Sequence, residues 1–221
     1  MAVIRPFECV RPQAEKAERV AALPYDVYNR EEACREVARE PLSFLKIDRA
    51  ETQFDSSVDT YAPEVYAKAK ELLENAIADG TFIKDSEQAY YIYELTMDGR
   101  VQTGLVACAS IDDYESNVIK KHENTRADKE LDRITHVDTC NAQTGPIFLA
   151  YRANAVINGE IDKAKKNSSL YNFVSPDGVR HQVWKISEPQ SVKAIRGAFE
   201  GISSIYLSLI HISEPTRQAE I

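Results

Sequence analysis

Hydrophobic residues recur along the chain with the 3.6-residue period of helices in several segments. The clearest repeat runs through residues 58–80 and consists of Val65, Ala69, Leu72, Leu73 and Ala76. Gly80 follows as a helix-ending residue. A second helix is predicted over residues 30–39, with Asn29 as its N-cap and acidic residues in its first turn. Further helices are predicted over residues 153–166 and from Pro189 to Phe199, the latter capped by Ser187.

Other segments are rich in β-branched and aromatic residues and are bounded by turn residues. Residues 89–96 and 101–111 flank the stretch MDGR, and a D-G pair between two such runs predicts a hairpin. A second hairpin is predicted within 171–186, turning at Pro176, Asp177 and Gly178. Shorter strands are expected at VIRPFECV, SFLKID and GPIFLAY, and residues 11–29 are expected to be loop and extended chain.

Antiparallel hairpins that alternate with helices predict an α+β fold, with a mixed, largely antiparallel sheet and flanking helices. Residues 1–206 are expected to form the N-terminal part of one domain, which is incomplete. The last residues, LSLIHISEPTRQAEI at 207–221, resemble the translated read-through of a sequencing-library adapter, so we expect a non-native tail there. The alternative is a native C-terminal strand, because LSLIHIS alternates between apolar and polar residues.

Composition changes this picture little. The 221 residues carry 27 basic and 35 acidic side chains, a net charge of −8, which argues against nucleic acid as the partner. No apolar run is long enough to span a bilayer, so no membrane association is expected. The four cysteines, Cys9, Cys34, Cys108 and Cys140, form no C-x-x-C pair and suit a reducing cytoplasm.

The most unusual segment is KKHENTRADKELDRITH at residues 120–136, in which eleven of seventeen side chains are ionisable. A helix capped by Thr125 places a basic stripe on one face, made of Arg126, Lys129, Arg133 and His136. A roughly opposite face is expected to enter the core with Ala127, Leu131 and Ile134. The basic stripe beside a free helix N-terminus predicts a phosphate site.

A carboxylate at such a site needs a role. Glu123, which follows His122, is expected to act as a base or to hold Mg²⁺, and phosphoryl transfer needs cations, a metal and a base. The alternative is a solvated face in which pairs such as Glu130 with Arg133 contribute about 0.3–0.5 kcal/mol each. Asp26, in the loop motif PYDV, is a weaker candidate that also fits turn chemistry.

Several motifs together resemble one family: AVIRPFECVRP, AALPYDVYNREEA, PLSFLKIDRAE, KHENTRADKELDR and GPIFLAY, in that order. They are similar to the domain of unknown function family numbered 1015, over residues 2–206. The resemblance implies a relationship to the ParB-like and sulfiredoxin-like fold, which includes kinases of free serine. His122, Glu123 and Thr125 match the family's histidine-glutamate-x-threonine block, and Arg133 matches the arginine after it.

The resemblance implies a nucleotide-dependent small-molecule kinase that uses ATP or ADP with Mg²⁺. Glu123 and His122 would then be catalytic with Asp26, which orients the acceptor, while Arg126, Arg133, Lys129 and Thr125 bind the nucleotide. The family continues past residue 206 into an aspartate-glycine-histidine-histidine-arginine segment, so this chain is expected to be an inactive fragment. The alternatives are a non-catalytic, nucleotide-binding regulator of ParB-like type and a purely structural helix face.

Overall fold

The computed structural model describes residues 1–121 and 127–209. The chain folds into two compact units. Of the described residues, the first unit holds 1–14, 84–121 and 148–208, and the second holds 15–83, 127–147 and Leu209. The fold is α+β with predominantly antiparallel sheets, as predicted. No helix in the described ranges has the length and apolar character needed to cross a membrane.

The largest sheet of the first unit has four antiparallel strands in the order β5-β4-β10-β9. Its strands are β4 (Tyr90–Met97), β5 (Arg100–Val106), β9 (Tyr171–Val174) and β10 (Arg180–Ile186). Both predicted hairpins are confirmed. Asp98 and Gly99 have φ of 51° and 78°, the positive values that a two-residue turn between β4 and β5 requires. Gly178 turns the second hairpin with a φ of 83°.

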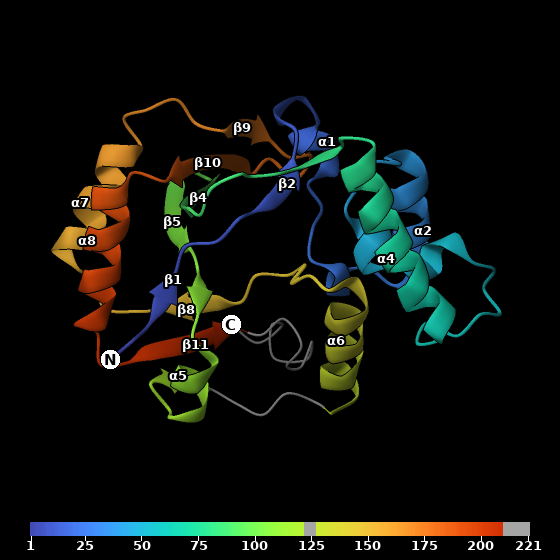
Figure 1. Ribbon diagram of the computed structural model, residues 1–221. Coiled ribbons are helices and arrows are strands. Elements are labelled where there is room, and N and C mark those ends of the chain that lie inside the picture. Colours follow the sequence, from blue (N-terminus) through green and yellow to red (C-terminus); the bar gives the residue numbers. More distant parts are fainter. Residues whose placement is uncertain (122–126, 210–221) are drawn as a thin grey trace. The chain divides into compact units, whose positions relative to one another are not determined.

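Shorter strands and three helices complete the first unit. β1 (Ile4–Arg5) pairs with β6 (Cys108–Ala109), and β11 (Ile205–Leu209) lies between β7 (Ile119–Lys120) and β8 (Phe148–Ala150). The helices are α5 (Ile111–Glu115), α7 (Ala155–Ala164) and α8 (Pro189–Glu200), and α7 packs beside α8 (Figure 1). The core includes Tyr90, Ile92, Ile157, Trp184, Ile195 and Phe199.

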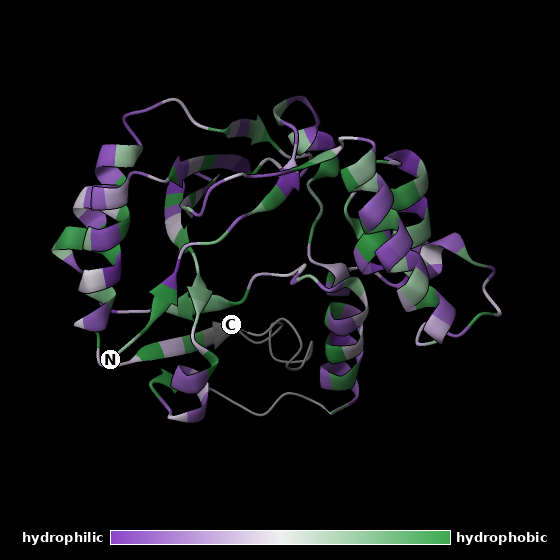
Figure 2. Cartoon of the chain, viewed as in Figure 1, coloured by the Kyte–Doolittle hydropathy of each residue, from purple (hydrophilic) through white to green (hydrophobic). Residues whose placement is uncertain are grey.

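The second unit is mainly helical. Its elements are α1 (Ala17–Val20), the 3-10 turn η2 (Tyr25–Val27), α2 (Arg30–Arg39), α3 (Leu45–Asp48), η3 (Ala50–Gln53), α4 (Pro63–Ala78) and α6 (Ala127–Cys140). Hydrophobic and hydrophilic residues alternate along α4 (Figure 2), whose buried face contributes Val65, Ala69, Leu73 and Ala76 to the core. The predicted Asn29 cap is confirmed, because its side chain accepts from the Glu32 backbone N–H and Glu32 reciprocates.

The remaining short elements lie near the points where the chain passes from one unit to the other. They are β2 (Val10–Pro12), the 3-10 turn η1 (Ala14–Lys16) and β3 (Phe82–Lys84).

Four local predictions are wrong. Residues 43–48 were expected to form a strand, but they end in helix α3. Residues 3–10 contain β1 and the start of β2 rather than one strand. Residues 11–29, expected to be irregular, contain α1 and η2. Helix α8 is preceded by Glu188 instead of Ser187, without a side-chain cap.

The helical state of residues 45–48 depends on the elements packed around this segment. Leu45 and Ile47 are both buried, and their alternation with polar neighbours gives the period of a strand. The backbone is nevertheless paired within the segment, because the Arg49 N–H donates to the Leu45 carbonyl oxygen at 2.7 Å. In this unit the surrounding helices α2 and α4 supply the apolar contacts, so a sheet partner is not needed.

Candidate functional site

Helix α6 carries the charged segment of the sequence, but it buries a different face from the predicted one. Leu131 and Ile134, which were expected to enter the core, are 65% and 57% exposed. The buried residues are Asp132, His136 and Cys140. The face that carries Arg133 and His136 is therefore the packed face of the helix. Polar groups are tolerated there because they find hydrogen-bond partners on other elements of the unit.

Four of the predicted site residues lie outside the described residues. They are His122, Glu123, Thr125 and Arg126. The predicted Thr125 cap and the predicted base and Mg²⁺ ligand, Glu123, are therefore not placed. In the described residues no group of three or more His, Cys, Asp and Glu side chains has the arrangement of a metal site.

The described part of the site is centred on Arg133. Its Cζ lies 4.3 Å from the centroid of the Tyr25 ring, which belongs to the PYDV motif. Its Nη2 and Nε lie 2.9 and 3.0 Å from Oδ2 of Asp132. The other carboxylate oxygen of Asp132 accepts a hydrogen bond of 2.9 Å from the Tyr66 hydroxyl on α4. The guanidinium therefore contacts both an aromatic face and a carboxylate, and each contact favours its charge.

Asp48 brings a second carboxyl group to this cluster from the C-terminal end of α3. Its Oδ1 accepts a hydrogen bond of 3.1 Å from Oγ1 of Thr144, which lies beyond the end of α6. Burial raises the pKa of Asp48 to about 6, and nearby Asp132 acts in the same direction, although Arg133 and Thr144 oppose the shift. Asp48 is therefore a carboxyl group that exchanges its proton close to neutral pH.

His136 lies one helical turn after Asp132 and has a defined protonation state. Its Nε2 is 3.2 Å from the Ile47 carbonyl oxygen, which only accepts, so Nε2 carries the hydrogen. Its Nδ1 is buried and has no hydrogen-bond partner among the described residues. Burial lowers the pKa of His136, and Arg133 acts in the same direction. A second proton on Nδ1 would have no acceptor, so the imidazole is neutral near pH 7.

The PYDV motif is fixed in place by Arg49, the residue after Asp48. The Arg49 Nη1 donates to the carbonyl oxygens of Tyr25 and Tyr28, at 2.9 and 2.6 Å, and its Nε pairs with Glu51 at 2.5 Å. These bonds satisfy two carbonyl groups of an irregular segment. They also hold the Tyr25 ring where Arg133 can stack on it.

The other two described candidates are Lys129 and Asp26, and they have different aromatic neighbours. Lys129 donates to the Tyr61 hydroxyl at 2.8 Å and lies over that ring, so it does not share Arg133's aromatic partner. Asp26 is exposed and follows Tyr25 directly, close enough to contribute to the raised pKa of that phenol, for which burial is the main cause. The structure therefore joins the PYDV motif to Arg133.

The sequence reading missed three members of this cluster. Asp48 lies in a segment that was predicted to be a strand, Asp132 belonged only to the alternative of a solvated helix face, and Thr144 was not considered. The one available signal was that Asp132 directly precedes Arg133, a member of the predicted basic stripe. Nothing in the sequence links Asp48 to them, because 84 positions separate Asp48 from Asp132 along the chain (132 − 48 = 84).

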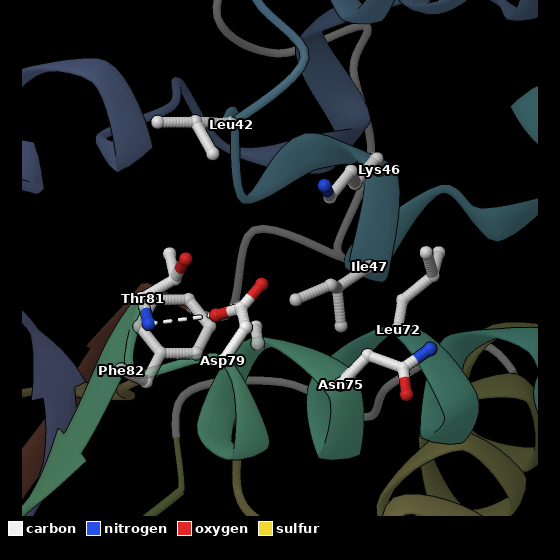
Figure 3. A pocket seen from close by; sticks show the side chains of 9 residues that line it. Leu42, Lys46, Ile47, Leu72, Asn75, Asp79, Thr81 and Phe82 are labelled. Carbon is white, nitrogen blue, oxygen red and sulfur yellow. Dashed lines mark hydrogen bonds between the residues drawn. The ribbon is translucent and has the colours of Figure 1, made fainter.

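A small pocket in the same unit does not include the cluster. It has a volume of about 70 Å³ and is lined by residues of α3, α4 and the start of β3 (Figure 3). Lys46 and Ile47 lie on one side and Leu72 and Asn75 on the other, and Asp79 accepts from the Thr81 backbone N–H at 2.7 Å. Sites for drug-sized ligands enclose about 300–1,000 Å³. This pocket is therefore too small for a nucleotide.

Comparisons with known proteins place the chain in a family without naming its activity. The family described as protein of unknown function (DUF1015) matches residues 4–208, which is most of the chain. No curated protein and no solved structure matches it. The family match agrees with the resemblance in the sequence motifs. The chain belongs to the DUF1015 family of proteins of unknown function.

Proposed function

We propose that this protein is a nucleotide-dependent phosphotransferase that uses ATP or ADP with Mg²⁺ to phosphorylate the hydroxyl group of a small molecule such as free serine. The observation that carries the proposal is the cluster of Arg133, Tyr25 and Asp48. It combines a cation suited to phosphate with a carboxyl group whose pKa is about 6. Phosphoryl transfer depends on such charge neutralisation and on a base for the acceptor.

The Arg133–Asp132 pair would have to open, at least in part, to admit a phosphate. Asp132 keeps a second partner when this happens, because the Tyr66 hydroxyl donates to its other oxygen. Arg133 keeps its contact with the Tyr25 ring. Neither group is then left without an interaction, which lowers the free-energy cost of the exchange. Glu123, as base or Mg²⁺ ligand, and Arg126 remain part of the proposal as residues before α6.

The second candidate is a non-catalytic regulator that binds a nucleotide in the manner of ParB-like proteins. The Arg133–Asp132 ion pair favours this function, because a cation already paired with a carboxylate can report the arrival of an anion by exchanging partners. The same residues would bind the phosphates in both functions. The two functions differ in whether a phosphoryl group is transferred.

Because residues 207–221 are expected to replace a segment of the family, the test uses the parent protein in which that segment is present. This protein is incubated with Mg²⁺, ATP or ADP, and a panel of small hydroxyl compounds that includes serine. Phosphorus NMR would detect a new phosphate ester, and calorimetry would measure nucleotide binding. Transfer supports the kinase, and binding without transfer supports the regulator. Absence of both binding and transfer would contradict both functions and leave α6 as a structural element.

Two arginine variants make the assay specific for the cluster. Arg133→Met should weaken nucleotide binding by about tenfold or more, because one charge-assisted contact to phosphate contributes roughly 1.5–3 kcal/mol. Arg35→Met is the matched control. Arg35 lies in the same unit, its side chain is 66% exposed, and it pairs only with Glu31 on the surface of α2. Equal effects of the two substitutions would show that Arg133 has no special role.

A further inference from the structure

We propose that Asp48 is the catalytic base of the transfer, and that it accepts the hydrogen of the acceptor hydroxyl through its Oδ2 atom. This inference rests on the proposed phosphotransferase function and assigns to Asp48 the role of base that was first given to Glu123, so that Glu123 keeps the role of Mg²⁺ ligand and Asp26 that of orienting the acceptor. It follows from the position of Asp48 in the folded second unit. Asp48 lies within the motif PLSFLKIDRAE, but the motif assigns it no role.

The bonding of Asp48 leaves one oxygen available. Thr144 donates to Oδ1 at 3.1 Å and thereby fixes the orientation of the carboxyl group. Oδ2 has no hydrogen-bond donor among the described residues, and Asp48 as a whole is half-buried. A carboxylate oxygen without a donor keeps its capacity to accept a hydrogen bond from a small ligand.

The other described carboxylates fit the role less well. Asp132 is engaged at both oxygens, by Tyr66 and by Arg133. Asp26 is exposed to solvent and lacks the partial burial of Asp48. Asp48 is the only one of the three that combines partial burial with an available oxygen, and burial is what makes a carboxylate a stronger base.

The charged groups around Asp48 come from several elements. Arg133 and Asp132 approach from α6, and the titratable groups of Cys140 on α6 and Tyr25 on η2 also interact with the Asp48 charge. Burial raises the pKa of Asp48 to about 6 despite the opposing effect of Arg133. Asp48 is therefore ionised at neutral pH and can take a proton, but it loses this ability as the pH falls below 6.

The proposed step moves one proton and one phosphoryl group. The O–H bond of the acceptor breaks and its proton moves to Oδ2 of Asp48. The acceptor oxygen forms a new bond to the terminal phosphorus of the nucleotide. The bond between that phosphorus and the bridging oxygen breaks, and its electron pair stays on the shortened nucleotide. Arg133, whose charge acts on Asp48, would stabilise the charge on the transferred group.

The first test compares Asp48→Asn with Asp138→Asn in the transfer assay. Asp138 is an exposed carboxylate on the same helix as Arg133 and serves as the matched control. Asp48→Asn should lower kcat by about 100-fold or more, the usual effect of losing a general base, while the KM for nucleotide stays within about threefold. A thermal melt establishes that the variant is folded. A folded Asp48→Asn variant with wild-type kcat would overturn the inference and leave the proposed function intact.

The second test uses Thr144→Val and the pH dependence of kcat/KM. The wild-type profile should fall on the acid side with an apparent pKa of about 6. Thr144→Val removes a hydrogen bond that lowers the pKa of Asp48, so this limb should move to higher pH. His136 also has a lowered pKa, but the groups that act on it are Ile47, Arg133 and Asp132 and do not include Thr144. An unmoved limb would therefore assign the profile to His136 and overturn the inference. Absence of transfer by the wild-type protein would overturn the proposed function and the assignment of Asp48 together.

Discussion

At the scale of single residues, the second unit keeps a carboxyl group where its charge is disfavoured. Burial holds the pKa of Asp48 near 6, whereas an ordinary aspartate has a pKa of 3.8. Because the pKa is higher in the folded state, the native protein binds more protons than the unfolded protein at pH values between the two pKa values. The contribution of Asp48 to stability is therefore full below the unfolded pKa and is lost as the pH rises through the folded pKa.

Asp48→Asn should stabilise the protein at pH 7, because the amide removes a charge that burial disfavours. A shift from 3.8 to about 6 corresponds to a gain on the order of 3 kcal/mol, and the gain should nearly vanish at pH 4, where the native aspartate is already protonated. Urea unfolding of wild type and variant at the two pH values measures it. His136 titrates in both proteins, so its contribution to the pH dependence cancels when the two free energies of unfolding are compared. A loss of stability at pH 7 would contradict the prediction, and Asp138→Asn should change nothing.

Asp85 in the first unit shows the opposite behaviour. Its carboxylate accepts from Arg11 at 2.9 to 3.1 Å, also accepts from the Tyr91 hydroxyl, and lies 3.3 Å from Lys185. Burial alone would raise the pKa of Asp85, but the bonds from Arg11 and Tyr91 outweigh it and leave the pKa below its usual value. The Asp85 carboxylate thereby connects Arg11 on β2 with Tyr91 on β4 and Lys185 on β10.

Asp85→Asn should destabilise the first unit by about 3–5 kcal/mol, because the partly buried guanidinium of Arg11 loses its counter-charge, while Lys185 retains its ion pair with Glu87. Trp184, the only tryptophan, lies in the core of that unit, so its fluorescence reports the unfolding. A folded pKa below the unfolded value means that this contribution is present above the unfolded pKa and is lost as the pH falls through the folded pKa. The difference between the proteins should therefore shrink in strong acid. A difference that persists there would argue against the ion pair as its cause.

At the scale of elements, α6 shows that hydrophobic spacing does not always mark the buried face. Leu131 and Ile134 are exposed, and the packed side carries Asp132, Arg133 and His136. Each of these polar groups has a partner from another element of the second unit: Tyr66 on α4, Tyr25 on η2 and the Ile47 carbonyl on α3. The helix is therefore oriented by polar contacts more than by apolar burial.

Leu131→Gln and Tyr66→Phe should have effects opposite to those expected from hydrophobicity. Leu131→Gln should change the free energy of unfolding by less than about 0.5 kcal/mol, as is usual for an exposed position. Tyr66→Phe keeps the ring but removes the hydroxyl that donates to buried Asp132, which should cost about 1–3 kcal/mol. Chemical denaturation measures both changes. A large loss for Leu131→Gln with no loss for Tyr66→Phe would restore the predicted core face.

At the scale of the whole molecule, each unit contains its own hydrophobic core. One core includes Ile92, Trp184 and Ile195, and the other includes Ile47, Val65 and Phe82. The candidate cluster lies within the second unit. The charged network around Asp85 lies within the first unit.

Ile92→Ala should destabilise the first unit by about 2–5 kcal/mol, because Ile92 is fully buried and its removal leaves a cavity. The urea midpoint followed by Trp184 fluorescence should fall accordingly. Val101→Ala is the matched control, because Val101 lies on the neighbouring strand β5 and is 55% exposed. Similar losses for the two variants would mean that burial in this sheet does not determine stability.

The sequence by itself determined the elements whose signals are local. The Asp98–Gly99 turn needs only two residues that tolerate positive φ, the Asn29 cap needs only the N–H group of Glu32, and the apolar stripe of α4 repeats within one helix. Tertiary structure decided which face of α6 is buried, whether residues 45–48 are helical, and that Asp48 lies near Arg133. These features depend on partners distant along the chain, and an isolated stretch of sequence carries no information about which distant groups will satisfy its charges and hydrogen bonds.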